Sequence, residues 1–215
     1  KSKAGFSRSR KVDQDGTTAL PELIAASLPD WLPAAVRHYL NHTEEGTSFR
    51  ALARREGLHA STILRQVRRY ENRRDDPLMD EALAAMSRLH LRSASDPDRK
   101  DDPPMSAQTS PTATDAPVGA TPELCDPQLL AREGRRILRR LAEPGAVMAI
   151  APEMEKAAVL REFPDGRSLR TAVLDRPVAQ AFILKAWIAC RKAGRVSTYE
   201  ITTAGRAAMK RMIDE

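Results

Sequence analysis

The chain has 215 residues, of which 41% are hydrophobic and 30% are charged, and its formal net charge is +6. No apolar run approaches the roughly 20 residues that a membrane helix requires, and no signal peptide is visible, so no membrane contact is expected and a cytoplasmic location is the default. The two cysteines, Cys125 and Cys190, lie far apart and outside any spacing typical of zinc sites. No metal site, cofactor or disulfide framework is therefore indicated, and the positive charge points to a polyanionic partner.

The first part of the chain is predicted to be helical after a short arm. Residues 1–16 are polar and basic, and they are expected to be disordered because they have too few apolar side chains to form a core. Residues 17–91 show helical spacing and are expected to form a bundle. Its last helix is predicted from Pro77 to about Leu91 with Asp76 as its N-cap, and the apolar face of this helix is expected to close the core.

Two helices are predicted at the start of this bundle. A short one is expected within residues 17–28, and Asp30 is expected to cap a longer one from Trp31 to His42. The longer helix carries His38 and His42, four residues apart on its less apolar side. Because no third ligand lies nearby, the two are interpreted as surface histidines rather than as a metal-binding pair.

The stretch from Thr47 to Arg74 predicts two further helices joined by a tight turn. The first, from Ser48 to Glu56, is stopped by Gly57, because glycine most readily takes the left-handed conformation found at helix ends. From Ala60 the helical spacing resumes, and one face then carries Ile63, Val67 and Tyr70. A helix, a glycine turn and a second helix at this spacing are typical of the DNA-binding helix-turn-helix.

The charge of this stretch supports the same interpretation. It contains eight arginines, no lysine and two glutamates, so its positive excess equals that of the whole chain. The planar guanidinium group suits phosphates and guanine edges. Arg65 is expected to read a base edge, while Arg50, Arg54 and Arg73 are expected to contact phosphates. The full set of predicted DNA-binding residues is Arg50, Arg54, His59, Ser61, Thr62, Arg65, Gln66, Arg68, Arg69 and Arg73.

Residues 92–127 differ in composition from the rest of the chain. They contain seven of the fifteen prolines and no aromatic residue, so they cannot bury enough apolar surface to offset the chain entropy lost on folding. They are predicted to form a flexible linker. A proline-rich linker is partly extended, so it is expected to hold the domains on either side apart.

Residues 128–215 are predicted to form a small α+β domain. Its elements are a helix from Pro127 to Leu141, a strand at 146–151, a hairpin turning at Pro164-Asp165-Gly166, a helix from Pro177 to Cys190, a strand at 196–201, and a helix from Ala204 to Ile213. The closing passage, RVSTYEITTAGRAAMKRM, resembles the strand-then-helix pattern YxxTxAGRxxL of many winged-helix regulators. Capping by Thr202 and close packing at Gly205 explain the passage equally well, so both interpretations stay open. The expected fold class is thus mainly α, with an N-terminal helix-turn-helix bundle, a Pro-rich linker and a C-terminal α+β domain.

Longer stretches on both sides of the linker resemble one bacterial family. They are WLPAAVRHYLNHTEEGTSFRALARREGLHASTILRQVRRYENRRDDPL in the first part, and REGRRILRRLAEPGAVMAIAPEMEKAAVLRE, DRPVAQAFILKAWIACRK and YEITTAGRAAMKR in the second. They resemble helix-turn-helix proteins joined to a C-terminal domain of unknown function, which include the activators of gene transfer agent clusters (GafA type). The resemblance implies a nucleoid-associated transcription activator that binds double-stranded promoter DNA through its first domain and engages RNA polymerase through other surfaces.

Two other kinds of protein carry an arginine-rich helix pair. A recombinase-type enzyme would need metal-binding carboxylates, but those near the second helix are better explained as helix caps and first-turn charges, and no catalytic motif is present, so no enzymatic activity is expected. An architectural protein would bind DNA without sequence preference. Because a single helix-turn-helix buries little surface on DNA, a second anchor is expected from a homodimer, from RNA polymerase or from the C-terminal domain.

Overall fold

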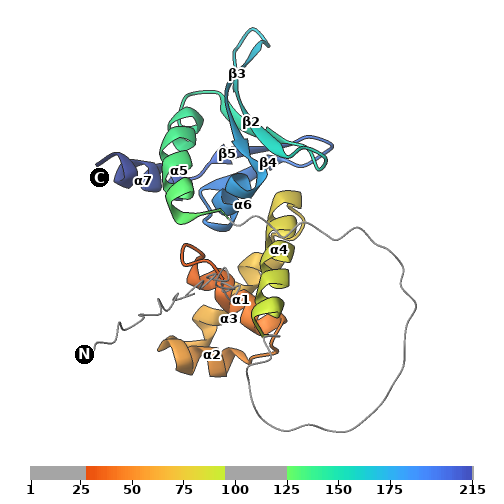
Figure 1. Cartoon of the computed structure of the whole chain (residues 1–215), viewed down its shortest axis with the longest axis vertical. Helices are drawn as coiled ribbons and strands as arrows, with labels where there is room; N and C mark the ends of the chain where they lie inside the picture. Colours follow the sequence, from red (N-terminus) through yellow and green to blue (C-terminus); the bar gives the residue numbers. More distant parts are fainter. Residues whose placement is uncertain (1–27, 95–124, 215) are drawn as a thin grey trace, which may run out of the picture.

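A computed structural model describes residues 28–94 and 125–214 of the chain, and Figure 1 shows their helices and strands. The arm predicted for residues 1–16, almost all of the helix predicted for 17–28 and most of the linker predicted for 92–127 lie outside these ranges. Within them, a group of helices comes first and an α+β part follows, as predicted. None of the described helices is both long and apolar enough to cross a membrane.

The N-terminal part consists of four helices, namely α1 (Ala34–Thr43), α2 (Phe49–Glu56), α3 (Ala60–Glu71) and α4 (Pro77–Ala94). Both α1 and α2 pack against α3. The faces that meet are apolar at helical spacing: Val36 and Leu40 from α1, and Ile63 and Val67 from α3, are fully buried. The predicted cap of α4 is confirmed, because Asp76 Oδ1 accepts the backbone N–H groups of the second and third helical residues at 3.2 and 3.5 Å.

The start of α1 differs from the prediction. The helix begins at Ala34 rather than at Trp31, and Asp30 does not cap it. A residue that precedes a proline is driven away from the helical conformation, and Pro33 itself has ψ 140° just before the first turn. Trp31 instead lies ahead of the helix, where its indole N–H donates to the carbonyl oxygen of Cys125 at 2.7 Å.

The C-terminal part is an antiparallel sheet of five strands with three helices. Its elements are α5 (Pro127–Leu141), β1 (Ala146–Ile150), β2 (Lys156–Glu162), β3 (Ser168–Asp175), α6 (Arg176–Leu184), β4 (Ile188–Lys192), β5 (Ser197–Ile201) and α7 (Thr203–Asp214). The strand order is β3-β2-β1-β5-β4. The predicted hairpin between β2 and β3 is confirmed, and Gly166 in its turn has φ 81°, where glycine is favoured.

The helix predicted from Pro177 to Cys190 is wrong in its second half. Helix α6 ends at Leu184, and the chain turns at Ala186, which has φ 54°. It then enters β4, which pairs with β5. Thr202 holds this turn, because its hydroxyl donates to the carbonyl oxygen of Ala186 at 2.6 Å and its N–H donates to that of Trp187 at 2.9 Å. A run of apolar residues alone does not distinguish a buried helix from a buried strand.

The passage compared with winged-helix regulators forms β5 and α7. Thr202 caps α7 by accepting the N–H of Gly205 at 3.0 Å. A Cβ atom at Gly205 would overlap the carbonyl oxygen of Trp187, so the glycine permits close packing. Strands separate α5, α6 and α7 along the chain, so this part contains no second pair of consecutive helices. Capping and packing therefore account for these residues, and the fold of this part is α+β.

The two parts of the chain pack directly against each other, and are not held apart as the linker prediction assumed (Figure 1). The contact is made mainly by α4, which lies against α6. Leu78, Ala82, Ala85 and Leu89 of α4 are buried. The helix contacts α1 and, more extensively, α6, so it joins the helical part to the C-terminal part rather than closing the helical core alone as predicted. The apolar pattern predicted a buried face but did not identify what would cover it.

Polar contacts reinforce this joint from several elements. Glu81 of α4 forms an ion pair with Arg176 and accepts a hydrogen bond from Gln180 Nε2 at 3.0 Å. Lys185 Nζ donates to the carbonyl oxygen of Trp31 at 3.1 Å. The most buried of these contacts is the hydrogen bond that the hydroxyl of Tyr199 in β5 donates to Asp76 Oδ1, at 2.8 Å. Burial raises the pKa of Tyr199, so its hydroxyl stays protonated and acts as the donor.

Removing the Tyr199 hydroxyl should weaken the whole fold. We predict that Tyr199→Phe lowers the free energy of unfolding by about 2 kcal/mol, because the bond is buried and its acceptor is a carboxylate. Tyr70→Phe is the matched control, since the Tyr70 hydroxyl also crosses the joint but donates to a neutral carbonyl, that of Leu184, at 3.4 Å. Urea unfolding of both variants checks this. A Tyr70→Phe loss as large as that of Tyr199→Phe would contradict it.

Candidate nucleic-acid interface

Local signals in the sequence position α2 and α3. Ser48 caps α2 by accepting the N–H of Ala51 at 3.3 Å. Gly57 ends the helix in the left-handed conformation, with φ 64°, as predicted. His59 then precedes α3 and accepts the N–H of Ser61 on its ring Nδ1 at 3.3 Å. The two helices are therefore joined by a turn of three residues, Gly57 to His59, as the sequence predicted.

The outer surface of this pair carries most of the predicted DNA-binding side chains. Burial of Ile63, Val67 and Tyr70 fixes which face of α3 is turned inward. The predicted residues that are exposed are Arg50, Arg54, His59, Arg65, Arg68 and Arg69. Those that are half-buried are Ser61, Thr62, Gln66 and Arg73.

The arginines of this stretch fall into two groups by their partners. Arg55 pairs with Glu56 at 3.0 Å, and Arg74 pairs with Asp80 at 2.7 Å. The other six have no side-chain hydrogen bond or ion pair among the residues that the structure describes, and they are Arg50, Arg54, Arg65, Arg68, Arg69 and Arg73. All six were predicted to bind DNA, whereas the two arginines with acidic partners were not. The positive charge of the pair is thus left without internal compensation.

The surface position predicted for His38 is wrong, and this changes the setting of Gln66. His38 is 2% exposed, because α1 packs directly on α3. Its Nδ1 lies 2.7 Å from Gln66 Oε1, and its Nε2 lies 3.7 Å from a carboxylate oxygen of Glu56. Hydrogen bonding by Arg55, together with the nearby His38, lowers the pKa of Glu56. His38 therefore links α1, α2 and α3. The side-chain oxygen of Gln66 contacts His38 inside the protein rather than an outside partner.

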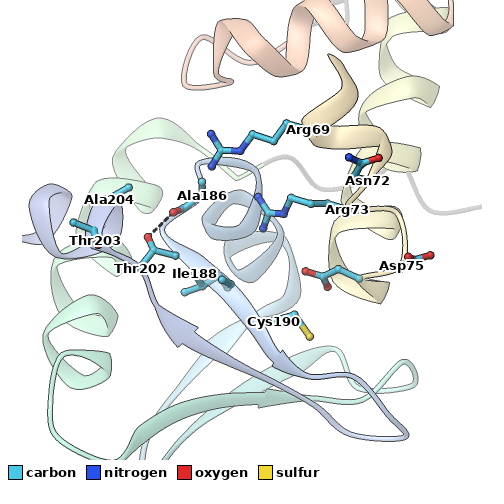
Figure 2. A pocket seen from close by; sticks show the side chains of 12 residues that line it. Arg69, Asn72, Arg73, Asp75, Ala186, Ile188, Cys190, Thr202, Thr203 and Ala204 are labelled. Carbon is cyan, nitrogen blue, oxygen red and sulfur yellow. Dashed lines mark hydrogen bonds between the residues drawn. The ribbon is translucent and has the colours of Figure 1, made fainter. Parts of the chain in front are cut away.

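Arg69 and Arg73 line a cavity together with residues of the C-terminal part. Figure 2 shows both guanidinium groups directed toward the C-terminal part, on the side of Ala186 and Thr202. Burial lowers the pKa of Arg73, which the nearby Asp76 partly opposes. The sequence predicted DNA contacts for both arginines but carried no signal that the C-terminal part would lie against the end of α3.

Comparison with known proteins does not assign this chain to a family. No family model, no curated protein and no solved structure matches the chain. Among residues 28–94 and 125–214, no three His, Cys, Asp or Glu side chains gather into a group that could hold a metal ion.

The buried contact of His38 should stabilise the helix pair. We predict that His38→Ala lowers the free energy of unfolding by roughly 2 kcal/mol, because it leaves a cavity and removes the partner of Gln66. His90→Ala serves as the control. His90 also contacts an acidic group, Glu45, at 2.9 Å, but the Glu45 side chain is 42% exposed, so the pair itself should contribute about 0.5 kcal/mol. Equal losses in thermal or urea unfolding would show that His38 has no special structural role.

Proposed function

We propose that the chain is a sequence-specific DNA-binding protein in which α2 and α3 form a helix-turn-helix and α3 is the recognition helix. The observation that carries the proposal is the set of six arginines on this pair that lack any internal partner. Keeping several like charges close together without counter-charges is unfavourable for the isolated protein, and a polyanion removes that cost.

The recognition role proposed for α3 is supported by the residues near its N-terminus. In a helix-turn-helix, residues near the N-terminus of the second helix meet base edges in the major groove, while the first helix crosses the backbone. Ser61, Thr62 and Arg65 lie in the first two turns of α3 and are at least partly exposed. Arg65 is suited to pair with the O6 and N7 atoms of guanine, and Arg50 on α2 is suited to a phosphate.

We further propose that this DNA-binding protein is a transcription activator that contacts RNA polymerase and controls a gene cluster of the gene transfer agent type. The support for this step is the resemblance described above, which covers sequence in both parts of the chain. Cutting the chain after α4 is not a clean test, because it would expose the face of α4 that packs against α6. The full chain is therefore the appropriate material for functional experiments.

The two DNA-contact roles make different predictions. Selection from random duplexes by the full chain should first yield a preferred site. Arg65→Ala should then weaken binding to that site by about 1–3 kcal/mol, with little effect on a scrambled duplex, because a lost base contact removes discrimination. Arg50→Ala should weaken binding to both duplexes alike and reduce the salt slope by about one. Fluorescence anisotropy over a salt series measures both effects.

Arg88→Ala is the matched control for these variants. Arg88 is exposed on α4 and has no ion-pair partner among the described residues, so its loss should leave DNA affinity nearly unchanged. Equal losses for Arg65→Ala on both duplexes would make Arg65 a phosphate contact. Failure to select any preferred site would favour an architectural binder, and strand cleavage with magnesium would favour a recombinase-type enzyme.

Activation is tested separately by reconstituted transcription with bacterial RNA polymerase. The full chain should increase transcripts only from templates that carry the selected site, and Arg65→Ala should remove this increase because it removes site recognition. Unchanged transcription from such a template, with the site shown to be occupied, would leave a DNA-binding protein but would contradict the activator role.

A further inference from the structure

A cavity of about 680 Å³ lies where the end of α3 meets the C-terminal part. One wall is formed by Arg69, Asn72 and Arg73, together with the turn that leads into α4. The other wall is formed by the turn between α6 and β4, by β4 itself and by the first residues of α7. Figure 2 shows the two arginines opposite Thr202, Thr203 and Ala204.

The two arginines supply positive charge to the cavity, and neither forms an ion pair with the acidic residues Asp75 and Asp76 that also line it. Neither guanidinium has a hydrogen bond or an ion pair within the described residues, although Arg73 is half-buried. Of these two acidic residues, Asp75 is exposed to solvent, whereas Asp76 is buried. Asp76 Oδ1 accepts hydrogen bonds from Tyr199 and from the N-terminus of α4, and its Oδ2 has no hydrogen-bond partner among the described residues. A half-buried guanidinium without a partner has lost hydration and gained no bond in return. An anion placed between Arg69 and Arg73 would supply that bond.

The opposite wall of the cavity adds further hydrogen-bond donors, which are backbone N–H groups. Helix α7 is twelve residues long and starts at Thr203. The N–H of Gly205 donates to the Thr202 hydroxyl, and that of Arg206 donates to the Thr202 carbonyl oxygen. The N–H groups of Thr203 and Ala204 have no acceptor among the described residues. Both residues line the cavity, so the positive end of α7 faces the same space as the two arginines.

We propose that this cavity binds a phosphate group, and that in the DNA complex this group belongs to the DNA backbone. The proposal rests on the DNA-binding function proposed above. Arg65 and Arg69 lie one turn apart on α3, about 6 Å along its axis, and Arg73 follows in the turn just after the helix ends at Glu71. The major groove is about 12 Å wide, so a helix α3 that reads a base with Arg65 brings its C-terminal end, and Arg73 just beyond it, toward the backbone. The C-terminal part thereby supplies the second DNA anchor.

Two variants test the two walls of the site in the full chain. Arg73→Ala should weaken binding to a duplex of random sequence about tenfold and reduce the salt slope by about one, whereas Arg88→Ala should change neither. Thr203→Pro removes one backbone donor while proline remains favourable at the first position of a helix. It should weaken binding about two- to fivefold, whereas Thr203→Ala, which keeps the N–H, should not. Unchanged melting temperatures establish that the variants are folded.

The outcomes separate this site from the proposed function and from a free ligand. Arg73→Ala losing affinity while Thr203→Pro does not would make Arg73 an ordinary phosphate contact, and the joint site would be wrong. Calorimetry with pyrophosphate, without DNA, provides the second arm. In one outcome, pyrophosphate binding depends on Arg73 while DNA affinity is unchanged in both variants. This outcome would identify a free phosphorylated ligand and overturn the backbone assignment. If both variants kept full DNA affinity and full pyrophosphate binding, the proposed site would be wrong. If the wild-type chain bound no DNA, the proposed function itself would be wrong.

Discussion

The packing of the two parts of this chain depends most on the contacts of the Asp76 carboxylate. Its Oδ1 atom accepts the Tyr199 hydroxyl at 2.8 Å and two backbone N–H groups at the start of α4. One buried side chain therefore starts the helix that follows the arginine-rich pair and attaches it to the central region of the sheet. Replacing such a group leaves buried donors without acceptors in two elements at once, which costs more than the loss of a single surface bond.

Helix α4 transmits this attachment to the rest of the molecule. Its apolar face is shared between the helical part and α6, so neither part buries its own surface completely without the other. The ion pair of Glu81 with Arg176 and the bond from Lys185 to the Trp31 carbonyl add polar contacts around the apolar ones. The consequence for function is geometric. The end of α3 and the beginning of α7 are held on opposite sides of one cavity, which a freely tethered pair of domains would not guarantee.

The distribution of charge follows a consistent pattern across this arrangement. Acidic side chains neutralise Arg55 and Arg74, which lie at the ends of α2 and α3, and leave the outward-facing arginines unpaired. Among the described residues, Arg37 Nε and Asp76 Oδ2 are buried without a hydrogen-bond partner, whereas His38 has one in Gln66. Arginines without an ion-pair partner also occur elsewhere in the described residues, as at Arg88 and Arg135, but six of them lie close together where the proposed DNA contacts lie. Local departures from the usual pairing of charges are expected at functional sites, because there the missing partner is the ligand.

The sequence by itself determined the features whose causes lie within a few residues. Gly57 ends α2, Asp76 begins α4, and the turn at Gly166 joins β2 to β3, because each depends on the conformation or capping ability of one residue and its immediate neighbours. Only the tertiary structure decided where α6 ends, whether His38 is buried and where Arg73 points. Each of these depends on residues far away in the chain, through the Thr202 bonds, the packing of α1 on α3 and the docking of the C-terminal part. An apolar or basic face predicts that something will cover it, but the identity of that partner is a property of the folded chain.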